Sequence, residues 1–61
     1  DLLVCYKGRF LALEVKTQRG KVSAEQTRWL ADMSALGAVA AVVRSVDEAC
    51  AVFDAALLEV R

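Results

Sequence analysis

Six consecutive apolar residues, Ala38 to Val43, are the feature that most constrains how this chain can fold. A short run of this kind, without charge or alternation, is typical of a β-strand covered on both faces. Gly37, directly before the run, predicts the end of a helix, because glycine readily takes the left-handed conformation of a C′ residue. Ser45 and Glu48, just after it, predict a second helix that begins with a capping box. The run is therefore expected to lie between two helices.

The N-terminal part of the chain predicts a β-hairpin. Residues 1–6 and 9–16 form two apolar stretches, separated by Lys7 and Gly8. Gly8 supplies the positive φ that tight hairpin turns need. A two-residue turn pairs residues whose numbers add up to fifteen, so that Cys5 faces Phe10 and Asp1 faces Glu14.

A polar loop, residues 17–21, leads to a helix that begins at Ser23, with Gln26 three positions on as a capping box. The expected inward stripes are Trp29, Leu30, Met33 and Leu36 on this helix, and Val46, Ala49, Cys50, Phe53, Ala56, Leu57 and Val60 on the second. A strand–helix–strand unit implies that 9–16 and 38–43 run parallel. The predicted fold class is α/β, in the order ββαβα, with a thin mixed sheet flanked by helices.

Composition excludes several classes of protein. The chain has 61 residues, is 57% hydrophobic and has no Pro, which is unlike a disordered tail. No long uncharged apolar run predicts a membrane span, and no leader suggests secretion, so a cytoplasmic location is expected, including nucleoid-associated or phage-encoded. With no His and no paired cysteine motif a zinc site is not expected, and Cys5 and Cys50 are predicted to be buried and reduced.

Charge is unevenly divided, although the chain carries eight basic and eight acidic residues. Residues 1–28 hold six basic and three acidic side chains, and residues 29–61 hold two and five. A basic half is suited to a polyanion such as nucleic acid, and an ordinary solvated surface would give the same count. Both interpretations stay open on charge alone.

The hairpin register gathers charged side chains at one end of the sheet. Asp1 is expected opposite Glu14, and Lys16 lies two residues further along the same face. Like charges directly opposed destabilise a strand pair, and a divalent cation such as Mg²⁺, which one or two carboxylates can hold, would offset them. The alternative is a solvated Asp1 together with a Glu14–Lys16 ion pair at a strand end.

These residues also resemble a known group of enzymes. An acidic residue that opens one strand, a hairpin, and then Glu14-Val15-Lys16 on the next strand resemble the PD-(D/E)xK nuclease superfamily. The wider string is similar to the VRR-NUC (virus-type replication-repair nuclease) family: Asp1-Leu2-Leu3, Gly8-Arg9-Phe10, Leu13 to Thr17, Ser23, Gln26 and Arg44-Ser45-Val46. The resemblance covers essentially the whole chain. It implies that 1–61 form a single nuclease domain with a restriction-endonuclease-like core, from which the family's first helix and strand are missing.

The resemblance implies a Mg²⁺- or Mn²⁺-dependent endonuclease that cleaves DNA phosphodiester bonds, with junction or flap DNA as substrate, as in repair and Holliday-junction resolution. Asp1, Glu14 and the Val15 backbone carbonyl would be metal ligands. Lys16 would orient or polarise the attacking water, and Gln26 would be the accessory polar residue of the motif. Arg19, Lys21, Arg28 and Arg44 are expected to contact DNA phosphates.

Several of these assignments have a structural alternative. Gln26 could serve only the helix cap with Ser23. Each basic residue could be a solvated side chain, and Arg44 could instead stack on the second helix. Trp29 is expected in the core and not as a platform for bases.

Assembly and function leave further alternatives. Ala51, Val52, Ala55 and Leu58 lie off the inward stripe of the second helix, and the first strand is apolar on both faces, which predicts a symmetric homodimer. A non-catalytic DNA-holding or dimerisation module of the same fold is one rival function, and a restriction- or recombination-type nuclease is another. The set of Asp1, Glu14 and Lys16 favours catalysis, because a purely structural domain has no need of it.

Overall fold

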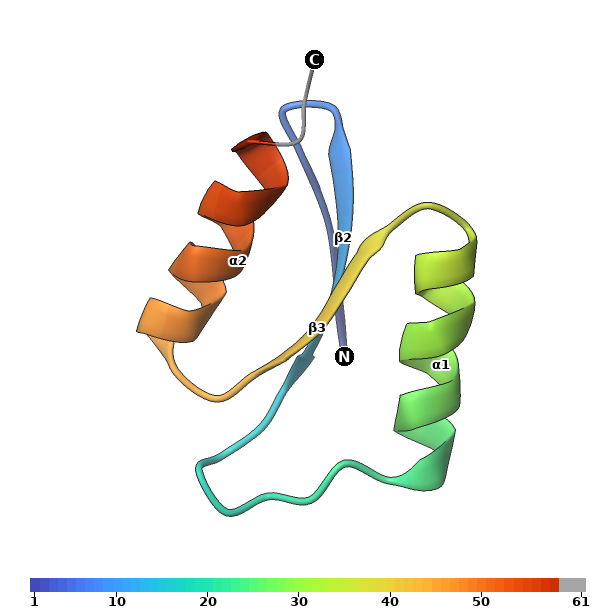
Figure 1. Ribbon diagram of the computed structural model, residues 1–61. Helices are drawn as coiled ribbons and strands as arrows, with labels where there is room; N and C mark the ends of the chain where they lie inside the picture. The colour runs from blue at the N-terminus through green and yellow to red at the C-terminus, as the bar shows by residue number, and fades with distance from the viewer. Residues whose placement is uncertain (59–61) are drawn as a thin grey trace.

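A computed structural model describes residues 1–58 of the chain as three strands and two helices (Figure 1). In chain order these are β1 (Leu2–Tyr6), β2 (Arg9–Val15), α1 (Ala24–Ala35), β3 (Val39–Val43) and α2 (Val46–Leu58). The strands form a single mixed sheet in the order β1-β2-β3. The predicted α/β class and ββαβα order are therefore confirmed.

The hairpin has the predicted register. Tyr6 pairs with Arg9 and Cys5 with Phe10, and the antiparallel ladder continues to Leu2, which pairs with Leu13. Lys7 and Gly8 form the turn with φ values of 49° and 81°. Two successive positive φ values are characteristic of a type I′ turn, whose twist matches that of the strands it joins.

The second pairing, between β2 and β3, is parallel, as the strand–helix–strand pattern predicts. Its register runs from Leu11 opposite Val39 to Val15 opposite Val43. The Lys16 backbone N–H donates to the Val43 carbonyl at 3.0 Å and extends this ladder by one step. The chain segments that follow β2 and β3 therefore leave the sheet side by side.

Both ends of α1 follow the sequence signals. The capping box of Ser23 and Gln26 is present at the N-terminus. At the C-terminus Gly37 has a φ of 101° and donates its N–H to the Ser34 carbonyl, while the Ala38 N–H donates to Met33. This pair of hydrogen bonds is a Schellman motif, which explains why the helix stops there.

The start of α2 corrects one expectation. Ser45 Oγ accepts the Glu48 backbone N–H at 3.0 Å, as a capping box requires. The Glu48 carboxylate, however, accepts the backbone N–H of Arg44 at 2.8 Å, one residue before Ser45. Only one of the two hydrogen bonds of a capping box is therefore present. The Glu48 carboxylate instead binds the backbone at the end of β3.

The two helices lie on opposite sides of the sheet (Figure 1). Gln26 of α1 contacts Glu14, whereas the Phe53 ring of α2 packs edge-on against Tyr6, 5.4 Å between centroids, on the other face. The buried apolar core is centred on β2 and comprises Leu11, Ala12, Leu13, Val43 and Ala56. Trp29 is half-buried within α1, in agreement with a packing role.

Several residues that were expected in the core are exposed. Leu36 and Val46 are about four-fifths exposed, because each lies at a helix end, beyond the sheet. Cys5 and Cys50 are also exposed and free, so the prediction that they are buried is wrong. Cys5 is uncovered because α1 packs mainly over β2 and β3, and Cys5 lies on the edge strand β1. Val60 lies outside the described residues. No helix within residues 1–58 is long and apolar enough to cross a membrane.

Candidate functional site

Glu14 is the one charged residue among 1–58 whose exposure falls to core values, at 3%. It is the last residue but one of β2, and the alternation of the strand turns it with Ala12 toward α1. Burying a carboxylate is costly unless donors compensate for the lost water. Its partners therefore determine what this end of the sheet can do.

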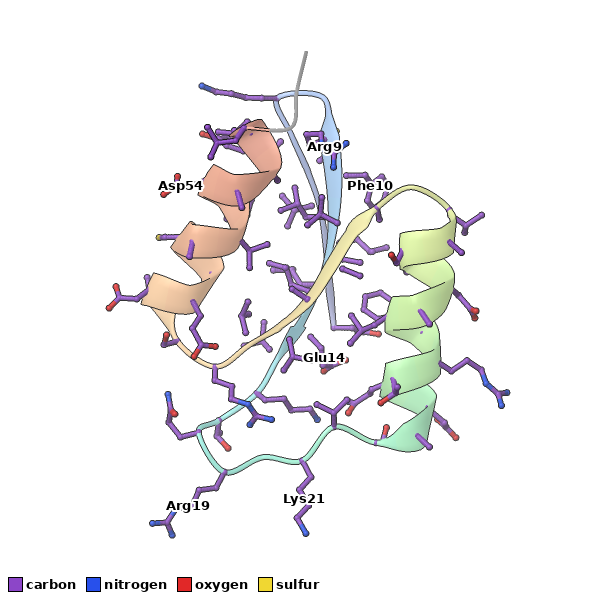
Figure 2. All side chains as sticks on the ribbon, in the orientation of Figure 1. Arg9, Phe10, Glu14, Arg19, Lys21 and Asp54 are labelled. Carbon is purple, nitrogen blue, oxygen red and sulfur yellow. The ribbon has the colours of Figure 1, made fainter. Side chains whose placement is uncertain are left out.

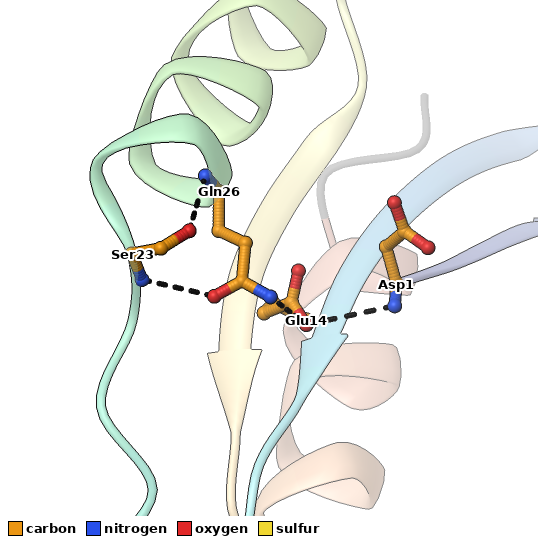
Figure 3. A network of polar contacts seen from close by, with 4 residues as sticks. All are labelled: Asp1, Glu14, Ser23 and Gln26. Atoms are coloured by element: carbon orange, nitrogen blue, oxygen red, sulfur yellow. Dashed lines mark hydrogen bonds and ion pairs between the residues drawn. The ribbon is translucent and has the colours of Figure 1, made fainter.

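Only one oxygen of the Glu14 carboxylate has partners (Figure 3). Oε2 accepts a hydrogen bond from Gln26 Nε2 at 3.2 Å and lies 3.5 Å from the Asp1 nitrogen. Oε1 is buried and has no hydrogen-bond partner among the described residues. A buried acceptor without a partner is rare in folded proteins and marks a place where a cation or water would be stabilised.

Gln26 serves the helix cap and the site at the same time. Its side-chain oxygen accepts the Ser23 backbone N–H at 2.9 Å, and Ser23 Oγ accepts the Gln26 backbone N–H at 3.1 Å. Because the amide oxygen is engaged in the cap, the amide nitrogen must face Glu14. One conformation of Gln26 thus completes the capping box and also contacts Glu14, and its role as the accessory residue of a nuclease motif stays a prediction.

Asp1 adjoins Glu14, as the register predicts, but in a different orientation. Figure 3 shows the Asp1 nitrogen, and not its carboxylate, turned toward Glu14. The Asp1 side chain is 65% exposed. The expected clash of two opposed carboxylates is therefore absent from this geometry, because Asp1 precedes β1 and its side chain turns out to solvent. The nitrogen carries a positive charge only as a free chain end.

Lys16 directly follows β2 and is half-buried. Within residues 1–58 its ammonium group forms no hydrogen bond or ion pair, so the alternative of a Glu14–Lys16 pair is wrong. The intervening Val15 belongs to β2, and its side chain is 59% exposed. The metal-binding role of its backbone carbonyl stays a prediction.

The available ligands are carboxylate oxygens, the type of ligand that a hard divalent cation prefers. Glu14 Oε1 lacks a partner among the described residues, and the Asp1 carboxylate lies at the neighbouring strand end with access to solvent. Mg²⁺ and Mn²⁺ are commonly bound by one or two carboxylates and otherwise by water and phosphate oxygens. Residues 1–58 contain no group of three or more acidic, His or Cys side chains gathered as a metal site. The site would thus be an open one, with most ligands from solvent or substrate.

The four predicted DNA contacts differ in their surroundings. Arg19 and Lys21 are exposed on the loop between β2 and α1, and they point away from the body of the molecule (Figure 2). Arg28 is exposed on α1, where Glu25 and Asp32 line the same shallow hollow and offset its charge. Arg44 is half-buried, and its guanidinium group donates to backbone carbonyls of the loop.

One contribution to this region escapes prediction from the sequence. Gln18 donates from its side chain to the Arg44 carbonyl at 3.1 Å, across 26 positions of the chain. The parallel pairing of β2 and β3 is the one signal that could have placed Arg44 next to this loop.

Comparison with known proteins returns no matching family model, no matching curated protein and no matching solved structure. The resemblance to VRR-NUC nucleases therefore stays a prediction that depends on the residues described above.

Proposed function

We propose that this chain is a metal-dependent DNA nuclease of the VRR-NUC type, with a restriction-endonuclease-like core. The observation that carries the proposal is the buried Glu14 carboxylate, whose Oε1 has no partner within residues 1–58, at the sheet end where Lys16 and the basic loop begin. A bound cation would supply the missing partner and offset the cost of burying the charge.

Each residue of the site has a defined task in this proposal. Glu14 Oε1, the Asp1 carboxylate and the Val15 carbonyl would hold Mg²⁺ or Mn²⁺, which supplies a Lewis acid and an activated water when bound. Gln26 occupies Oε2 and so leaves Oε1 for the cation. The Lys16 ammonium, which follows Val15 at this end of the sheet, would stabilise negative charge that develops at the phosphate.

The substrate class follows from the charges that surround the site. Arg19 and Lys21 are exposed and without acidic partners among the described residues, which suits contacts to DNA phosphates. Junction or flap DNA is the proposed substrate, and a homodimer would offer two sites to paired strands. With DNA as its substrate, the protein would act in the cytoplasm or at the nucleoid.

The test is a cleavage assay on a labelled four-way DNA junction with Mn²⁺ or Mg²⁺. Glu14→Gln and Lys16→Met are expected to lower the cleavage rate by about a hundredfold or more, the scale seen when a group that stabilises the transition state is removed. Glu25→Gln and Lys7→Met are the matched controls, because they make the same changes at exposed positions outside the proposed metal-binding set. Both controls should cleave at the wild-type rate.

Two outcomes would overturn the proposal in different ways. Junction binding by the wild type without cleavage in either metal would favour a non-catalytic DNA-holding module. Wild-type cleavage by Glu14→Gln would place the chemistry elsewhere in the molecule.

A further inference from the structure

The loop between β2 and α1 is tied to the end of β3 by one side chain. Arg44 Nη1 donates to the Thr17 carbonyl at 2.8 Å and to the Gly20 carbonyl at 2.6 Å. Gln18 Nε2 donates in return to the Arg44 carbonyl at 3.1 Å. Three hydrogen bonds thus join Arg44 to a segment more than twenty positions earlier in the chain.

Arg44 is itself held in place by the fold. Its backbone N–H donates to Glu48 Oε1 at 2.8 Å in the first turn of α2. The preceding residue, Val43, is buried and accepts the Lys16 N–H. The Arg44 side chain therefore extends from a backbone that is held in place. The loop that it binds follows β2, the strand next to β3. Charge-assisted hydrogen bonds from such a preorganised planar group are stronger than those between neutral groups.

The segment that Arg44 holds is the one that carries the exposed cations. Arg19 lies between Thr17 and Gly20, the two residues whose carbonyls Arg44 binds, and Lys21 follows directly. Both side chains point outward from the loop (Figure 2). A guanidinium that faces the loop backbone from within is poorly placed to reach a phosphate on the outside.

We propose that Arg44 is a positioning residue that holds Arg19 and Lys21 as a preformed pair of phosphate contacts, and not a DNA contact itself. The inference rests on the proposed DNA substrate. Residues that are ordered before binding lose less conformational entropy when DNA binds, so the anchor raises affinity without adding a charge contact.

The salt dependence of DNA binding separates the two roles. Affinity for a labelled four-way junction is measured without divalent cation, over a range of salt concentrations, for wild type, Arg44→Met, Gln18→Ala and Lys21→Met. Log affinity falls with log salt, and a lost phosphate contact reduces the magnitude of this negative slope by about 0.9. Lys21→Met is expected to show that decrease. Arg44→Met and the uncharged Gln18→Ala are expected to weaken binding about tenfold, through loop disorder, with the wild-type slope.

A decrease in the magnitude of the slope for Arg44→Met equal to that of Lys21→Met would overturn the proposal, as would wild-type affinity in Arg44→Met.

A second measurement needs no DNA. The Gly20 N–H donates to the Thr17 carbonyl at 3.2 Å within the anchored turn, so its hydrogen exchange reports on the order of the loop. Exchange at Gly20 should become about tenfold faster in Arg44→Met, while the amides of β2 keep their protection. If the chain fails to bind the junction, the proposed function fails and this result still decides the anchor role. Unchanged exchange at Gly20 would refute it.

Discussion

At the scale of single residues, the Gln26 amide is bound at both of its ends. Its oxygen accepts the Ser23 N–H, and its nitrogen donates to Glu14 Oε2. A glutamate at this third helical position would satisfy the cap equally well and would interact favourably with the helix dipole. Only an amide can also donate to a carboxylate. The residue type therefore follows from the site and not from the helix.

Replacing Gln26 by Glu tests this reasoning, because helix rules and site geometry predict opposite changes in the free energy of unfolding. Helix rules predict unchanged or higher stability for Gln26→Glu. The site predicts a loss of about 1–3 kcal/mol in the free energy of unfolding, because Glu14 loses its donor and gains a like charge nearby. Urea denaturation at neutral pH measures the difference.

Ser23→Ala is the control for the cap, since it removes only the hydroxyl and should cost about 1 kcal/mol. Gln26→Glu with wild-type stability would show that the bond to Glu14 contributes nothing to the fold.

Much of this site could be predicted from the sequence, because spacing along a strand or a helix determines it. The proximity of Asp1 to Glu14, and the cap of Ser23 with Gln26, both follow from such spacing. The orientation of Asp1 does not, because a side chain before the first strand is not set by the ladder. The anchor formed by Arg44 and Gln18 depends on tertiary contacts that no local pattern contains.

At the scale of the elements, the hairpin turn contains a strained position. Lys7 has a φ of 49° and is the single non-glycine residue with positive φ among residues 1–58. The left-handed region costs a residue with a Cβ atom about 1 kcal/mol or more, and asparagine tolerates it better. Lys7 recovers part of this cost because its ammonium lies 5.7 Å from the centre of the Tyr6 ring.

Lys7→Asn is expected to stabilise the domain by about 0.5 kcal/mol, since relief of the backbone outweighs an exposed cation–π contact of about 0.5 kcal/mol. For a domain of this size that corresponds to a rise in melting temperature of about 2–4 °C. Thermal unfolding followed by circular dichroism measures it. Gly8→Ala should lower the melting temperature, because φ is 81° at this position and a Cβ atom disfavours that conformation. No neighbouring atom would clash with the added methyl group. A lower melting temperature for Lys7→Asn would contradict the argument.

The bounds of the helices and strands, and the pairing of the strands, could be predicted because local sequence signals mark them. Turn residues, caps and the apolar run at 38–43 each mark a local structure, and the crossover rule fixes the parallel pair. Burial was less predictable. The predicted stripe on α2 includes Cys50, which is exposed in an open hollow that it lines together with Val4 and Tyr6 of β1.

At the scale of the whole molecule, β1 is an edge strand with apolar side chains that remain exposed. Leu3 is 52% exposed and Phe10, on the same face, 46%. Leu2 and Tyr6 on the opposite face are also exposed. Uncovered edges of this kind favour pairing with another chain, and symmetric dimers are the commonest result.

Light scattering at micromolar protein is expected to return the mass of a dimer. Leu3→Lys should give a monomer, because a lysine on an edge strand disfavours pairing and apolar contact. Val46→Lys introduces the same charge at an exposed position on α2 and should leave the dimer intact. A monomer mass for the folded wild type would refute dimerisation, and a dimer that survives Leu3→Lys would place the interface elsewhere.

The central claim is that the buried Glu14 carboxylate holds a divalent cation, and calorimetric titration with Mn²⁺ tests it most directly. The matched variants are Glu14→Gln and Glu25→Gln, which make the same substitution at a buried and at an exposed position. We predict saturable binding of Mn²⁺ to the wild type and to Glu25→Gln, and none to a folded Glu14→Gln. Equal binding by all three proteins, or no binding by the wild type at millimolar Mn²⁺, would contradict the claim.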